Sequence, residues 1–161
     1  MDGYTYLDFA ENDYNFFMHN YQDGVIANNM AAEAQNACEK YLKHLIEEYD
    51  DGTNTSGHFS HDRILKSHSL GNLINYIEEA MDISIPDQAK TDMLQISGYY
   101  FNTRYPGDDS FFATETDMDK CAKALDSCRN FVLEIVHEKE EELKQFAQNV
   151  NSFIADDDWD R

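Results

Sequence analysis

The chain has 161 residues, which is ample for one domain and too few for two domains of ordinary size. Hydrophobic residues make up 42% of the sequence and aromatic residues 13%, so a core is available and a wholly disordered chain is excluded. Acidic residues outnumber basic residues by 32 to 12, which gives a formal net charge of −20. Tight binding to DNA, to RNA without sequence preference or to anionic membranes is therefore disfavoured, because such binding depends on cations that neutralise phosphates.

Apolar residues recur every three or four positions along most of the chain, a spacing that predicts helices. The five predicted helices cover about 7–21, 24–49, 70–81, 86–105 and 116–154. Turn-forming residues predict a loop between the second and third helices, over Asp50–Gly57. No sustained alternation of apolar and polar residues competes with these helices, so no strand is predicted.

Residues that favour helix ends mark several boundaries. Ser67 or Ser69 is expected to cap the third helix, and Pro86 is expected to begin the fourth. The segment Tyr105–Gly107 ends the fourth helix, because proline and glycine do not easily continue one. In the last helix, the polar run His137–Glu142 is predicted to be a solvated stretch or a bend.

Together these elements predict an all-α protein, an antiparallel up-and-down bundle of about five helices. One domain is predicted over residues 1–155. Residues 156–161 are mostly aspartate and are predicted to form an acidic disordered tail.

The three cysteines do not indicate a disulfide scaffold. Cys121 and Cys128 are seven residues apart in a helical stretch, about 10 Å along its axis, which is too far for a disulfide. Cys38 and Cys128 can meet across two helices, and we expect buried, reduced thiols. No signal-peptide pattern or membrane-spanning apolar stretch is present in the sequence, so we expect a cytoplasmic chain that does not bind membranes.

Three motifs carry a family resemblance. Ala31–Lys43 is an alanine- and glutamine-containing helical segment that ends in Glu-Lys-Tyr-Leu-Lys, and Ser67–Leu70, with Leu73 after it, forms a His-x-Leu-x-x-Leu helix start. Tyr99–Gly107 contains an aromatic residue, three others and then Arg-Tyr-Pro. In this order and approximate spacing, over about 5–140, the chain resembles the HEPN domain family.

The resemblance implies a five-helix bundle of the type found in substrate-binding subunits of nucleotidyltransferases, paired as a homodimer. Many such proteins are prokaryotic and are encoded beside a minimal nucleotidyltransferase, in two-component or toxin–antitoxin systems. Some are metal-independent ribonucleases, and others bind nucleotides or act as assembly modules. The surplus of aromatic and small residues on the first two predicted helices fits a homodimer seam there.

The ribonuclease branch of the family carries an arginine, a polar residue and a histidine on the final helix. Arg129 and Asn130 match the start of this pattern, but seven residues separate Arg129 from His137, more than the pattern has. In a regular helix His137 then lies about 80° around the axis from Arg129. Arg129, Asn130 and His137 are the candidate catalytic residues of a ribonuclease; the alternative is that they are surface residues of an acidic helix.

The candidate nucleotide-binding residues are Lys40, Lys43, His68, Tyr100 and Arg104. Arginine and lysine suit phosphate, and a base can stack on Tyr100. The structural alternative is that Arg104 pairs with Glu33 or Glu39, that the lysines form ordinary surface ion pairs, and that His68 only hydrogen-bonds backbone.

Metal binding is not predicted. His58, His61 and His68, with Asp62, are of the residue types that zinc and nickel accept, but their spacing matches no metal-binding motif. No cofactor is expected.

These observations favour a non-catalytic or weakly catalytic HEPN-like dimer that binds a nucleotide or a partner protein such as a minimal nucleotidyltransferase. A metal-independent ribonuclease using Arg129 and His137 is one alternative. A structural adaptor without a nucleotide site is the other.

Overall fold

The computed structural model describes residues 3–53 and 60–157, and within these ranges the secondary structure is entirely helical. The helices are α1 (Tyr6–Gln22), α2 (Asn28–Tyr49), α3 (His61–Ile64), α4 (Leu70–Glu79), α5 (Asp87–Gln95), α6 (Tyr99–Asn102) and α7 (Glu115–Asp157). The prediction of an all-α bundle is confirmed. Part of the predicted loop 50–57 lies outside the described residues.

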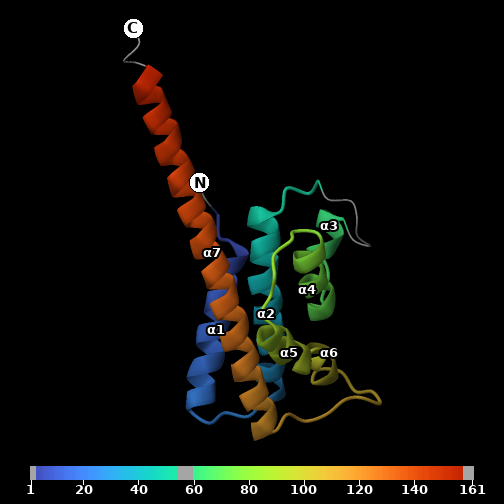
Figure 1. Cartoon of the computed structure of the whole chain (residues 1–161). Helices are drawn as coiled ribbons and strands as arrows, with labels where there is room; N and C mark the ends of the chain where they lie inside the picture. The colour runs from blue at the N-terminus through green and yellow to red at the C-terminus, as the bar shows by residue number, and fades with distance from the viewer. Residues whose placement is uncertain (1–2, 54–59, 158–161) are drawn as a thin grey trace.

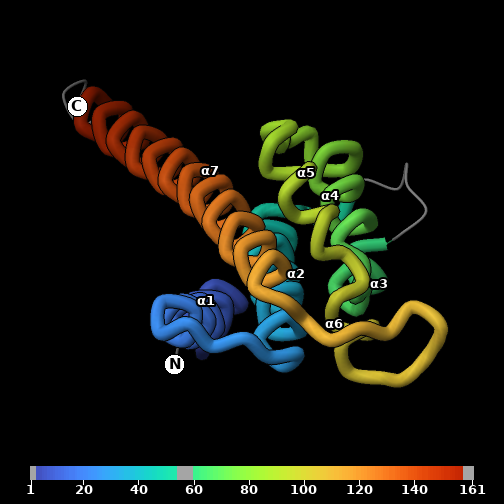
Figure 2. Tube along the Cα trace, turned by 90° about the horizontal axis from the view of Figure 1, so that it is seen from below, coloured from blue at the N-terminus to red at the C-terminus, as the bar shows by residue number. Residues whose placement is uncertain are grey.

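Three long helices form the centre of the bundle. Helix α1 runs antiparallel to α2 and α7, while α2 and α7 run in the same direction side by side (Figure 1). The backbone N–H of Ala113, just before α7, donates to the side chain of Asn28 at the start of α2 over 2.7 Å. The short helices α3 to α6 lie on the side of α2 away from α1 (Figure 2).

Two helix ends follow local chemistry. Thr5 and Asp8 form a capping box at the start of α1, and of the two serines proposed for the third predicted helix, Ser69 is the one that caps α4. Pro86 precedes α5 as expected. The prediction of one continuous fourth helix is wrong, because the structure divides it into α5 and α6. The break lies at Gly98, whose φ of +89° is in the left-handed region that a right-handed helix does not use.

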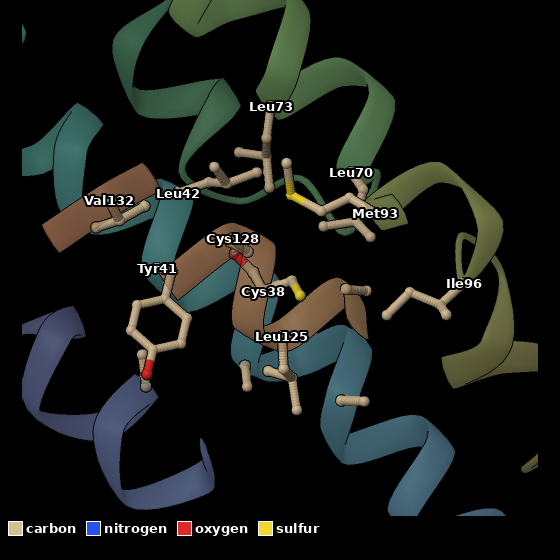
Figure 3. Packing of buried hydrophobic residues seen from close by; sticks show 14 of the residues in the cluster. Cys38, Tyr41, Leu42, Leu70, Leu73, Met93, Ile96, Leu125, Cys128 and Val132 are labelled. Atoms are coloured by element: carbon tan, nitrogen blue, oxygen red, sulfur yellow. Dashed lines mark hydrogen bonds between the residues drawn. The ribbon is translucent and has the colours of Figure 1, made fainter. Parts of the chain in front are cut away.

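The core lies between α2, α4, α5 and α7 (Figure 3). Helix α2 is buried along most of its length, and Leu42 and Leu45 are fully buried. Cys38 on α2 and Cys128 on α7 meet there, where the Cys128 thiol contacts the Cys38 carbonyl oxygen over 3.7 Å. All three cysteines are buried and free, as expected. The neighbouring Cys128 thiol and burial raise the pKa of Cys38 well above its usual value.

Tyrosine hydroxyl groups bind many of the acidic side chains that join the helices. Five tyrosines donate to a carboxylate at 2.5 to 2.9 Å. The pairs are Tyr14–Asp126, Tyr21–Asp119, Tyr41–Glu11, Tyr76–Asp50 and Tyr99–Asp117. Each hydroxyl is a neutral donor to a carboxylate, in a chain that has only 12 lysines and arginines. Of the five carboxylates, Glu11 also forms an ion pair with Arg129.

Helix α7 is continuous through the polar run 137–142 and projects past the other helices (Figure 1). The helix includes Asp156 and Asp157, two residues of the predicted disordered tail; residues 158–161 lie outside the described part of the chain. None of the described helices is long and apolar enough to cross a membrane.

Candidate functional site

The family-like motifs converge at a corner between α2, the start of α4 and α6. Gln35 on α2 is buried and connects the other two segments. Its side-chain oxygen accepts from the backbone N–H of Tyr100 over 2.7 Å, and its nitrogen donates to the carbonyl oxygen of His68 over 3.3 Å. The same nitrogen donates to Glu39 over 3.2 Å, so one amide side chain fixes the corner.

His68, Tyr100 and Arg104 form a set of stacked side chains at this corner, which we call the corner stack. The rings of His68 and Tyr100 are nearly parallel, with an interplanar angle of 9° and centroids 6.4 Å apart. The Arg104 guanidinium carbon lies 4.8 Å from the centroid of the Tyr100 ring. The imidazole of His68 is 3.2 Å from a Glu39 carboxylate oxygen. Three of the five predicted nucleotide-binding residues are thus brought together.

The two lysines among the predicted residues are placed differently. Lys40 forms an ion pair with Asp13 of α1 and therefore helps to join the first two helices. Lys43 is only 6% exposed, and burial lowers its pKa in spite of the nearby Glu39 carboxylate. Neither lysine lines the two clefts described next.

Arg104 lies between two clefts. The loop cleft, about 280 Å³, is lined by Asn28, Asn102, Thr103, Arg104, Tyr105, Pro106, Ser110, Phe111 and Phe112. The helix cleft, about 550 Å³, is lined by Asn12, Asp13, Phe16, Asn29, Ala32, Glu33 and Arg104. Arg104 forms no ion pair with any described carboxylate, so the expected partners Glu33 and Glu39 do not neutralise it by direct contact.

The two clefts differ in charge. The helix cleft contains two carboxylates, and burial together with the neighbouring Asp13 raises the pKa of Glu33. The loop cleft contains no carboxylate among its lining residues and offers Arg104, amides, a serine hydroxyl and aromatic rings. Of the two, the loop cleft is the one whose chemistry suits an anion attached to a flat ring.

Asn28 shapes the loop cleft and was not singled out from the sequence. Its amide nitrogen donates to the carbonyl oxygens of Thr103 and Phe111 at 3.0 and 3.2 Å, and its oxygen accepts from Ala113. These bonds hold both ends of the loop between α6 and α7. An asparagine at the start of a helix carries no distinctive sequence signal, because such residues are common at caps.

The predicted catalytic arginine is occupied by an ion pair. The guanidinium of Arg129 donates two hydrogen bonds to Glu11 of α1, at 2.7 and 3.1 Å, and lies over the Tyr14 ring at 4.7 Å. Tyr41 also donates to Glu11. Burial raises the pKa of Glu11, but the hydrogen bonds from Arg129 and Tyr41 outweigh it and leave that pKa below its usual value.

The other two catalytic candidates do not join Arg129 in this chain. Asn130 and His137 are exposed on α7. Arg129 and His137 are eight positions apart on one continuous helix, about 12 Å along its axis, which exceeds hydrogen-bond reach of a common atom. The structure of one chain therefore does not assemble these residues into a site.

The described residues contain no cluster of three or more histidine, cysteine, aspartate or glutamate side chains arranged to hold a metal ion. His61 contacts Asp50 over 2.8 Å and His68 contacts Glu39, so each has one carboxylate partner. His58 lies outside the described residues.

Comparison with known proteins relates this fold to one family. Neither the curated proteins nor the solved structures contain a significant match to the chain. The family model of the HEPN domain matches residues 5–142, which include the three long helices as far as the polar run of α7 and the whole corner stack. The chain therefore belongs to the HEPN domain family.

Proposed function

We propose that this protein is a non-catalytic, cytoplasmic HEPN module that binds a nucleotide in the loop cleft. The observation that carries the proposal is Arg104: it lines the cleft, lies against an aromatic ring and has no described carboxylate as an ion-pair partner. In a chain with a net charge of −20, a cation without such a partner beside a cleft is a suitable anchor for phosphate.

The other residues of the loop cleft offer groups that could contact the base and the sugar of a nucleotide. Phe112, which is 89% exposed, and Tyr105, which is 48% exposed, present aromatic surface at its edge. Asn102 and Ser110 supply hydrogen-bonding groups. A volume of about 280 Å³ is near the lower end of the range for ligand pockets, which suits a mononucleotide.

The overall charge limits the ligand to one with few phosphates. A polynucleotide would bring many phosphates against an acidic surface, whereas a mononucleotide places its charge at Arg104 alone. The ion pair of Arg129 with Glu11 supports the non-catalytic part of the proposal, because that arginine already has a partner inside the chain.

Thermal unfolding with added nucleotide tests the proposal. Ligand at about ten times its Kd stabilises a protein by about 1.4 kcal/mol, which for a chain of this size raises Tm by about 3–6 °C. We expect this rise with a nucleoside monophosphate, a smaller one with inorganic phosphate and none with the nucleoside. The variant Arg104→Gln should lose the response. Lys144→Ala is the matched control, since it removes one exposed cation far from the cleft and should keep the response.

Loss of the response in both variants would show that general charge, not the loop cleft, governs binding. If no nucleotide raises Tm at millimolar concentration, the nucleotide proposal is wrong, and a structural adaptor without a nucleotide site is the alternative. In that case the acidic surface would suit a basic partner protein, for which a minimal nucleotidyltransferase is the candidate that the family suggests.

A further inference from the structure

The end of α7 forms an arm that no other helix covers. Residues 143–157 extend beyond the bundle as a helix of about 20 Å, and all of them are exposed (Figure 1). The HEPN family model ends at residue 142, so the arm is an addition to the matched domain.

One face of the arm is apolar. Its large apolar side chains are 39% to 71% exposed and are Leu143, Phe146, Val150 and Phe153, with Ile154 beside them. Eighteen residues make five helical turns, so residues eighteen positions apart lie on the same side of a helix. Leu143, Phe146 and Val150 are each eighteen positions after a fully buried residue of α7. These buried residues are Leu125, Cys128 and Val132. The core-facing stripe of α7 therefore continues where the bundle no longer covers it.

We propose that this arm pairs with the arm of a second copy of the chain, in antiparallel orientation, as a short two-helix coiled coil. Leu143, Phe146, Val150 and Phe153 are separated by three, four and three residues, the spacing of the a and d positions of a heptad. A stripe of this kind is covered in a coiled coil by the same stripe of a neighbouring helix.

In an antiparallel register, every a or d residue of the stripe faces an apolar residue of the second copy. With a positions facing d positions, Leu143 lies opposite Phe153 of the second copy, and Phe146 lies opposite Val150 of the second copy. Symmetry repeats both pairs. The next layer outward at each end places Lys139 opposite Asp157 of the second copy, which joins opposite charges.

A parallel pairing would be less favourable. It would place Lys139 opposite Lys139 of the second copy and Asp157 opposite Asp157 of the second copy, so like charges would face each other at both ends. The charge pattern at the two ends of the stripe thus selects the antiparallel orientation.

A second copy fits the arm better than a basic partner does. Residues 145–155 contain no charged side chain, although 27% of the whole sequence is charged. Two copies that each carry −20 repel one another, and an uncharged segment is where they can approach most easily. The five apolar side chains expose roughly 450 Å² per copy, more than half of the roughly 800 Å² that each partner buries in a standard interface.

Sedimentation equilibrium of the full chain tests the pairing. We expect a dimer at micromolar concentration, and Phe146→Asp should raise its Kd at least about tenfold, because it places a charge in the centre of the seam. Phe9→Asp is the matched control: Phe9 is an exposed phenylalanine on α1, where a seam between the first helices would lie. Phe9→Asp should leave the Kd unchanged, and circular dichroism should show both variants folded.

Charge reversal tests the orientation. Lys139→Asp and Asp157→Lys should each weaken the dimer, and the double variant should restore it, because the pair of opposite charges is then regenerated in reverse. A monomeric wild-type chain would overturn the proposal. So would a dimer that Phe9→Asp breaks and Phe146→Asp does not, or a double variant that fails to recover. None of these outcomes depends on nucleotide binding.

Discussion

Replacing Arg129 by methionine removes a link between the first and last helices while keeping the aliphatic part of the side chain. The arginine donates two hydrogen bonds to Glu11 and lies over the Tyr14 ring. Glu11 keeps its bond from Tyr41 in the variant, so its carboxylate is not left without a donor. We therefore expect destabilisation without unfolding.

The magnitude follows from the contacts and their exposure. Hydrogen bonds to charged groups contribute about 1.5–3 kcal/mol, and the stacking of a cation on an aromatic ring adds about 0.5–1 kcal/mol. The side chains of Arg129 and Glu11 are 30% and 31% exposed, so solvent screens part of the attraction. We expect Arg129→Met to lower the free energy of unfolding by about 2–3 kcal/mol, or Tm by about 4–12 °C.

A double-mutant cycle measures the link itself. Glu11→Gln keeps an acceptor for Tyr41 but removes the charge that Arg129 binds. Urea unfolding of the wild type, both single variants and the double variant should give a coupling energy of about 1–2 kcal/mol. A coupling energy below about 0.5 kcal/mol would show that the ion pair does not stabilise the fold, and would free Arg129 for another role.

Three further outcomes are expected. Asn28→Ala should lower the free energy of unfolding by about 1–3 kcal/mol, as measured by differential scanning calorimetry. The variant removes the donor to the carbonyl oxygens of Thr103 and Phe111 and the acceptor for the N–H of Ala113. Burial lowers the pKa of His44, whose Nδ1 is buried without a described hydrogen-bond partner. Below about pH 6.5 the unfolded chain therefore binds a proton that the folded chain does not, and the free energy of unfolding should fall as the pH drops. Equilibrium unfolding from pH 8 to pH 5 should show a smaller fall for His44→Phe than for the wild type. The three buried thiols should be inert to a thiol reagent in the native protein and should all react after denaturation, whereas rapid native labelling would contradict their burial.

The sequence predicts the long helices well, because their apolar spacing has one consistent period. It leaves open whether the polar run 137–142 is a solvated stretch of one helix or a bend, and the structure shows that α7 is unbroken there. It does not predict the break between α5 and α6. That break depends on Gly98, and a single glycine in a helical pattern does not show whether it adopts a left-handed conformation.

The candidate site is predicted in part. His68, Tyr100 and Arg104 come from motifs far apart in the chain, and the family resemblance is what relates them; the spacing of apolar residues does not. The partner of Arg129 could not be chosen from the sequence, because Glu11 is one of 32 acidic residues and only the packing of α1 on α7 selects it.

The tyrosine–carboxylate bonds bear on how this acidic protein responds to salt. A hydroxyl donor is neutral, so each bond holds a carboxylate in place while its negative charge persists. Mobile ions screen the repulsion among those charges far more than they weaken a short hydrogen bond. Raising the ionic strength should therefore raise Tm, and we expect the protein to be more stable in concentrated salt than in very dilute buffer.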